Sequence, residues 1–176
     1  MNPVTSFGGL SLFMAVAILT PSRGVEPDEV VAVIVKPGSV SLRVQEVMLL
    51  YRRKKLFLRN SDKANPVNLP ASSPLRGLFS QVILGAPPED LEKYWNYMYF
   101  QGVSPPFVLS SEEAVMRFVS TTPGAIGYVS YCNVDLRVKV ALVFTATGLI
   151  SEGAARAICL RLDNRAKPAE HGAPRT

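Results

Sequence analysis

The chain has 176 residues, which is long enough for one domain with a hydrophobic core plus tails. It holds two cysteines and one histidine, and His171 lies in a stretch rich in Pro and Ala near the C-terminus. Classical zinc spacing is absent, and histidine-dependent catalysis would have to use this tail residue. No spacing points to a serine nucleophile activated by lysine either. We therefore expect no catalytic residues, no metal and no cofactor, which predicts a protein that is not an enzyme.

The formal net charge is +5, and cations cluster in residues 52–55, with Arg59 and Lys63 close behind. Such a cluster can indicate a partner that carries phosphates. Apolar residues stand at helical spacing before this cluster: Val44, Val47, Met48 and Tyr51. The cations therefore lie near a helix end, where solvated Lys and Arg are favourable. Because no aromatic platform or recognised motif accompanies the run, we expect a solvated face and no nucleic-acid partner.

The first residues have the pattern of an export signal. Residues 10–19 form an apolar stretch, and Ser22 and Gly24 supply small residues before Val25. The stretch is shorter than the roughly 20 apolar residues of a membrane span. No Lys or Arg precedes it, so an uncleaved anchor or a different start codon stays open. The sequence predicts a signal peptide over residues 1–24 and a periplasmic or secreted protein.

The two cysteines, Cys132 and Cys159, have two readings. An oxidising compartment would allow them to pair as a disulfide. Two free, buried cysteines are an equally good interpretation, so the pairing stays open at this point.

The first half of the mature chain alternates strand and helix signals. Residues 30–35 are a continuous β-branched run, typical of a strand buried on both faces. Ser41 is the expected N-cap of a helix through Tyr51, and a polar turn leads to a strand at residues 66–69. The next helix has Ser73 as N-cap, Pro74 at its first position, and Gly85 at its end. Its apolar residues fall at helical spacing: Leu75, Leu78, Phe79, Val82 and Ile83.

A third helix is expected after residues 87–88, ending near Gly102. One side of this helix carries Leu91, Tyr94, Trp95 and Met98. Their helical spacing favours core packing over a binding platform. Tyr97 and Tyr99 are expected to stay exposed. A fourth helix opens with a capping box at residues 110–113 and buries Val115, Phe118 and Val119.

Residues 125–129 and 138–144 read as strands, the second being the last. Ser151 is the expected cap of a short helix through Leu162, and residues 165–176 have the composition of a mobile tail. The pattern predicts one α/β domain over residues 25–147, with a central mixed sheet flanked by about four helices, and a C-terminal extension over residues 148–176.

The strand-to-helix junction at residues 68–79 is the main functional candidate. A helix N-terminus leaves backbone N–H groups unpaired and carries partial positive charge. Ser72 and Ser73 would add hydroxyl donors there, and Arg76 would add a guanidinium. The chemistry suits a small oxyanion.

Two stretches carry a resemblance to a known family: residues 68–79, and residues 122–129, which read Thr-Pro-Gly-Ala-Ile-Gly-Tyr-Val. Through them the chain resembles the periplasmic substrate-binding proteins of phosphate ABC transporters, particularly short, single-lobe homologues. The resemblance implies one lobe of a periplasmic-binding-protein-like fold and a phosphate or oxyanion ligand. A membrane transporter or sensor is the implied protein partner.

In that family a loop Arg-x-x-x-Ser-Gly-Thr holds the phosphate. Ser72 and Ser73 lie at the position of its serine, Pro74 replaces the threonine, and Asn68 stands where the family has arginine. Arg76, one helical turn on, is the candidate substitute for that arginine. The resemblance thus points to Asn68, Ser72, Ser73 and Arg76 as the anion site.

The turn at residues 123–127 and the lobe as a whole each allow another interpretation. The turn at residues 123–127 lies between a helix and a strand, whereas a dinucleotide fingerprint runs from strand to helix, so its glycines are predicted to serve backbone conformation and packing. A lone lobe also exposes a face that a second lobe would cover, so an interaction module without ligand is the alternative function. It would act as a homodimer or by docking on a membrane protein.

Overall fold

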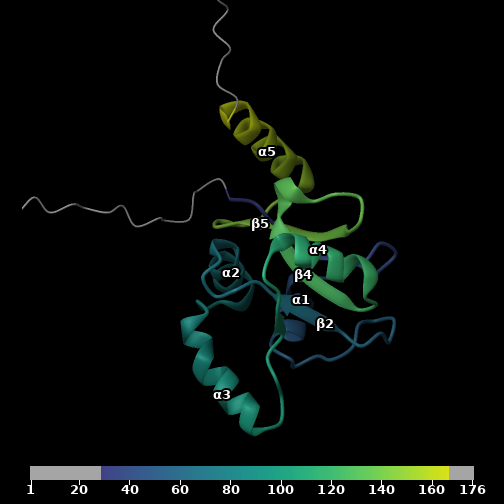
Figure 1. Cartoon of the computed structure of the whole chain (residues 1–176), viewed down its shortest axis with the longest axis vertical. Coiled ribbons are helices and arrows are strands. Elements are labelled where there is room, and N and C mark those ends of the chain that lie inside the picture. Colours follow the sequence, from purple (N-terminus) through teal and green to yellow (C-terminus); the bar gives the residue numbers. More distant parts are fainter. Residues whose placement is uncertain (1–28, 167–176) are drawn as a thin grey trace, which may run out of the picture.

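A computed structural model describes residues 29–166 of the chain (Figure 1). The expected export signal and His171 lie outside these residues. The body is a mixed six-stranded sheet with the order β3-β2-β4-β1-β5-β6. The strands are β1 (Val31–Val35), β2 (Asn65–Asn68), β3 (Phe107–Val108), β4 (Ala125–Ser130), β5 (Lys139–Thr145) and β6 (Gly148–Leu149). The predicted α/β class with a mixed central sheet is confirmed.

Strand β1 lies at the centre of the sheet, antiparallel to both β4 and β5. All five of its residues are buried, as the continuous β-branched run predicts. Strand β2 runs parallel to β4 and to the short β3, so the sheet changes from antiparallel to parallel at β4. This change places the C-terminal end of β2, and the loop into the next helix, beside the short edge strand β3.

Helices cover both faces of the sheet, and neighbouring residues of β4 show how. A Cβ on Gly127 would lie 2.3 Å from Cγ1 of Val115, in helix α4 (Glu112–Thr121). The next residue, Tyr128, points to the other face and stacks on Phe79, the last residue of α2 (Pro74–Phe79), at 4.1 Å between ring centroids. Figure 1 shows α2 and α4 on opposite sides of β4. The close contact at Gly127 confirms the structural role predicted for the turn glycines.

The cap signals of α2 are confirmed, but the capping box predicted at residues 110–113 is wrong, because the N-cap of α4 is Ser111 and its third residue is Ala114. Ser73 is the N-cap of α2 and Pro74 its first residue, and after a π-helical turn over Ser80–Leu84 the chain leaves at Gly85 with φ of 75°. Ser111 caps α4 by accepting a hydrogen bond from the backbone N–H of Ala114 at 3.2 Å.

Helix α1 (Val44–Tyr51) begins later than predicted. Its N-cap is Arg43, and the Glu46 carboxylate accepts a hydrogen bond from the Arg43 N–H at 3.1 Å. The expectation of Ser41 as N-cap is wrong, because this acidic side chain satisfies the N-cap N–H two residues further on.

Helix α3 (Glu92–Phe100) follows a 3-10 turn over Glu89–Leu91 and projects from the body (Figure 1). Leu91 is buried, but α3 itself has no fully buried residue. The predicted apolar face is therefore only partly core, because Tyr94, Trp95 and Met98 are half-buried. Tyr97 and Tyr99 are exposed, as predicted. Trp95 is half-buried and packs against the core at the base of the helix, while the distal half covers no strand.

The base of α3 is held by part of the basic cluster. Arg52 is half-buried: its guanidinium donates to the backbone oxygen of Leu84, and its own backbone oxygen accepts a hydrogen bond from the Tyr94 hydroxyl. Arg53 is half-buried too and donates to the Ala64 oxygen at 3.4 Å. The predicted solvated face is therefore wrong for these two arginines, which tie loops together, and correct for exposed Lys54.

The C-terminal part differs from expectation in two ways. Strand β6 follows β5 and pairs with it, so residues 138–144 are not the last strand. Helix α5 (Glu152–Ala166) has 15 residues, longer than expected, and includes Arg165, which was predicted to lie in a mobile tail. Its start is as predicted, since the Ser151 hydroxyl accepts a hydrogen bond from the Ala154 N–H at 3.2 Å. Cys132 and Cys159 form a disulfide, which decides between the two readings of the cysteines.

Candidate anion-binding site

The β2–α2 junction is a tight turn that opens directly into a helix. The Ser73 N–H donates to the Pro70 oxygen at 2.9 Å, and the N–H groups of Arg76 and Gly77 donate to the Ser73 oxygen at 3.0 and 3.2 Å. Since Pro74 has no N–H, the first turn offers one donor fewer than a helix with threonine there. Backbone donation to an anion is correspondingly reduced.

The two serines differ in exposure. Ser72 is exposed and Ser73 is half-buried. The Ser73 hydroxyl makes no capping hydrogen bond, although serine at an N-cap usually makes one. It is therefore free to donate to a ligand above the helix start.

Arg76 turns toward the interior. Its Nε and Nη1 atoms are buried and have no hydrogen-bond partner among the described residues. Its charge acts on the fully buried Tyr51 phenol: burial raises the pKa of Tyr51 well above its usual value, Tyr128 adds to the shift, and Arg76 partly offsets it. A guanidinium with two unsatisfied donors in such a place lacks an acceptor.

Asn68, at the end of β2, is only 3% exposed. Its carboxamide oxygen accepts a hydrogen bond from the Tyr128 hydroxyl at 3.3 Å, and this hydroxyl accepts from the Leu69 N–H at 3.2 Å. The Tyr51 hydroxyl donates to the backbone oxygens of Val67 and Ile126, at 2.9 and 3.2 Å. Asn68 thus belongs to a buried polar cluster with two tyrosines, beneath the loop that carries Ser72.

Two solved structures of phosphate-transport proteins share this fold. An ABC-type phosphate transport receptor from Vibrio cholerae aligns with a TM-score of 0.52 and 18% identity, over 66% of this chain and 48% of that one. A putative phosphate ABC transporter substrate-binding protein with bound phosphate, from Clostridium perfringens, aligns with a TM-score of 0.53 and 17% identity, over 66% and 46%. This chain has a periplasmic-binding-protein-like fold.

The chain spans about half the length of these two proteins, as expected for a single lobe. At such identities the likeness concerns the fold. No family model and no curated protein sequence matches the chain.

One buried polar residue of the lobe was not anticipated. Ser80 is fully buried, its hydroxyl has no partner among the described residues, and it begins the π-helical turn after α2. It lies four residues after Arg76, so the two side chains share a helix face. Spacing alone could have paired them, but nothing in the sequence around Ser80, which lies between Phe79 and Gln81, indicates that it is buried.

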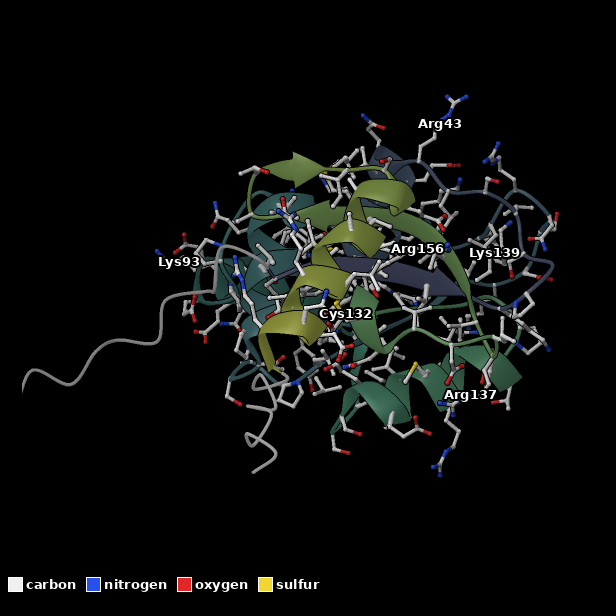
Figure 2. All side chains as sticks on the ribbon, turned by 90° about the horizontal axis from the view of Figure 1, so that it is seen from above. Arg43, Lys93, Cys132, Arg137, Lys139 and Arg156 are labelled. Atoms are coloured by element: carbon white, nitrogen blue, oxygen red, sulfur yellow. A yellow bond between two sulfur atoms is a disulfide. The ribbon has the colours of Figure 1, made fainter. Side chains whose placement is uncertain are left out.

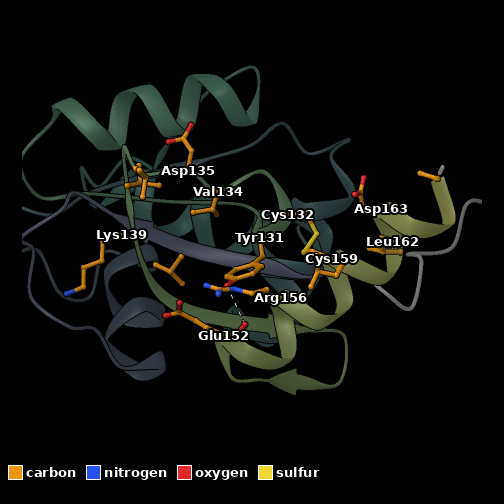
Figure 3. A pocket seen from close by; sticks show the side chains of 15 residues that line it. Tyr131, Cys132, Val134, Asp135, Lys139, Glu152, Arg156, Cys159, Leu162 and Asp163 are labelled. Carbon is orange, nitrogen blue, oxygen red and sulfur yellow. Dashed lines mark hydrogen bonds between the residues drawn. A yellow bond between two sulfur atoms is a disulfide. The ribbon is translucent and has the colours of Figure 1, made fainter.

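A large groove lies elsewhere on the lobe, between α5, β5 and the 3-10 turn Tyr131–Asn133 (Figure 3). Its volume is about 1020 Å³, and none of the four predicted site residues lines it. The Tyr131 hydroxyl donates to the Glu152 backbone oxygen at 3.4 Å across its floor. Both cysteines of the disulfide line this groove.

Within residues 29–166 no group of three or more His, Cys, Asp or Glu side chains is arranged to hold a metal ion, and no helix is long and apolar enough to cross a bilayer. Among the labelled basic side chains of Figure 2, Arg43, Lys139 and Arg137 lie toward one side of the molecule and Lys93 toward the opposite side.

Proposed function

We propose that this protein is an exported, non-enzymatic module that binds phosphate or a similar oxyanion at the β2–α2 junction. The observation that carries the proposal is Arg76, whose Nε and Nη1 are buried without an acceptor. Buried donors, and charges above all, cost free energy unless they are paired. An oxyanion seated at the helix start would supply the missing acceptor.

The neighbouring groups suit the same ligand. The Ser73 hydroxyl is uncommitted, the Ser72 hydroxyl is exposed, and the helix start carries partial positive charge. Asn68 would act from below, by holding Tyr128 and the end of β2 in place. Because Pro74 removes one N–H, binding is expected to be weaker than in a loop with threonine.

The proposed location and partner rest on other features. The disulfide suits an oxidising compartment, in keeping with a signal peptide over residues 1–24. The solved structures with this fold are described as a phosphate transport receptor and a transporter substrate-binding protein. We therefore propose a membrane transporter or sensor as protein partner.

Calorimetric titration of the full chain with phosphate, sulfate and a neutral sugar tests the ligand. Phosphate or sulfate should give saturable heat at millimolar concentration, and the sugar none. Arg76→Gln should weaken binding about tenfold or more, because a charge-assisted hydrogen bond is lost. The matched control is Arg161→Gln, since Arg161 is exposed and bonds only within α5.

A folded protein that gives no heat with either anion would overturn the proposal. Equal weakening by Arg76→Gln and Arg161→Gln would point to a general charge effect and remove Arg76 from the site.

The second candidate is an interaction module without ligand, and the exposed end of α3 favours it. Tyr97, Tyr99 and Phe100 are 65%, 70% and 85% exposed, and residues 94–111 contain no charged side chain. Depletion of charge with enrichment of Tyr, Trp and Phe is typical of interface cores. A stable dimer by light scattering, lost in Phe100→Ser, combined with no anion response would favour this function.

A further inference from the structure

The Cys132–Cys159 disulfide lies at the surface of the molecule. Cys132 is in the 3-10 turn after β4 and is exposed, while Cys159 is in α5 and half-buried. Figures 2 and 3 show Cys132 directly against α5. An external thiolate can therefore approach the Cys132 side of the bridge, which is the first requirement for thiol–disulfide exchange.

Apart from this bridge, α5 has a small apolar contact with the body. Of its 15 residues only Ala155 is buried, Ile158 is half-buried, and Leu160 is 60% exposed. Ordering a helix of this length costs conformational entropy. Burial of Ala155 and partial burial of Ile158, Cys159 and Leu162 offset this cost only in part. The covalent tie is thus a major reason for the docked position of α5.

Helix α5 covers an apolar patch on the α4 side of the sheet. Val30 and Val143, 1% and 4% exposed, form a small cluster with Ala155, separate from the main core. The half-buried Val140 and Ile150 pack against the same cluster. Departure of α5 would expose this patch and remove one wall of the groove of about 1020 Å³.

We propose that the disulfide is a reducible latch that decides whether α5 covers this patch. With the disulfide formed, α5 covers the patch and the groove lies beside this helix. Unlocked, the lobe exposes an apolar strand surface centred on Val30 and Val143. The latch is distinct from the β2–α2 junction, since neither cysteine belongs to that loop.

The chemistry needs a dithiol reductant. Its first thiolate attacks the sulfur of Cys132, the more exposed of the two residues, a mixed disulfide forms, and Cys159 leaves as a thiolate that takes up a proton. The second thiolate of the reductant attacks its own partner sulfur, and Cys132 leaves as a thiolate and is protonated in turn. Two electrons pass from the dithiol, which ends as a disulfide, to the protein, which ends with two thiols.

Hydrogen exchange read by mass spectrometry tests the latch on the full chain, with dithiothreitol as the reductant. On reduction the amides of α5 should exchange about tenfold or more faster, while those of β1 and β4 keep their protection. A disulfide that is reduced only when the whole domain unfolds would overturn the proposal. So would an α5 that stays fully protected after reduction.

The double variant Cys132→Ser/Cys159→Ser supplies the matched control. It should show the fast α5 exchange without reductant, no further change with dithiothreitol, and stronger binding of an apolar fluorescent dye than the oxidised protein. Unchanged α5 protection in a folded double variant would contradict the latch. If the variant does not fold, exchange on the reduced natural chain decides, and its global unfolding counts against the proposal.

Discussion

At the scale of single residues, Arg76 is the side chain whose environment is least satisfied. Its buried Nε and Nη1 have no partner among the described residues, so replacing it with an apolar side chain of similar length should relieve a cost rather than create one. We expect Arg76→Met to raise the free energy of unfolding by about 1 kcal/mol in anion-free buffer, measured by urea denaturation. The exposed Arg161→Met should change it by less than about 0.5 kcal/mol. A destabilised Arg76→Met protein would mean that Arg76 serves the fold, not a ligand.

Tyr51 gives a pH prediction. Burial, reinforced by Tyr128 and partly offset by Arg76, raises the pKa of this phenol in the folded protein above its unfolded value. A raised pKa means that the folded state holds the proton more tightly, so its contribution to stability is complete below about pH 10 and is lost as pH rises further. Unfolding free energies measured from pH 8 to pH 11 should fall above pH 10.

The control for this prediction is Tyr51→Phe. Loss of the hydrogen bond to the Val67 and Ile126 oxygens should cost about 1 kcal/mol at neutral pH. The variant should also lose less stability than the natural chain between pH 10 and pH 11. Tyr94, whose pKa burial raises and Arg52 partly lowers, accounts for part of the remaining slope. Parallel curves for the two proteins would show that Tyr51 does not titrate in this range.

At the scale of elements, the packing of α4 on β4 depends on Gly127. A Cβ there would meet Val115 Cγ1 at 2.3 Å and Val119 Cγ2 at 3.1 Å, so Gly127→Ala forces α4 outward. We expect a loss of about 2 kcal/mol in unfolding free energy. Adding Val115→Ala should recover part of it, because the two changes share one contact.

Gly77→Ala is the matched comparison for Gly127→Ala. Gly77 lies within α2, and a Cβ there meets no atom within 4 Å. The Gly77→Ala protein should have a higher free energy of unfolding than the natural chain, since alanine is the better helix former. Equal effects at the two glycines would contradict the proposed packing.

Elements with complete local signals were predictable from the sequence. The β-branched run indicated β1. A cap and a proline marked the start of α2, and Gly85 marked the end of the π-helical turn that continues it. The predicted face of α3 is only partly buried, because helical spacing of aromatic residues shows that one face is apolar but not how much of it another element covers. The inward turn of Arg76 and the burial of Asn68 depend on two tyrosines from α1 and β4, which no spacing near residue 76 reveals.

At the scale of the whole molecule, strand order joins segments that are far apart in sequence, such as Val31 with both Ser130 and Phe144. Such pairings are set by packing across the whole sheet and are not written in any local pattern. The disulfide belongs to the same scale, because its formation depends on the fold that brings Cys132 to α5 and on the compartment.

Anion binding should also be visible in the stability of the whole lobe. A ligand that binds only the folded state stabilises it by about 2.7 kcal/mol at roughly 100 times its dissociation constant. For a chain of this size that corresponds to a rise in Tm of about 5 °C or more. Thermal unfolding followed by circular dichroism, with phosphate against chloride of equal ionic strength, measures the difference.

The variant Arg76→Met separates ligand binding from the general effect of salt on the fold. If the anion pairs with Arg76, the Tm of the natural chain should be higher in phosphate than in chloride. The Tm of Arg76→Met should be the same in both salts. This should hold although the variant is expected to be the more stable protein without ligand. Phosphate is also excluded from protein surfaces and stabilises folded chains without binding a site. An equal rise in both proteins would therefore be this solvent effect. It would leave the exposed aromatic end of α3 as the better clue to function.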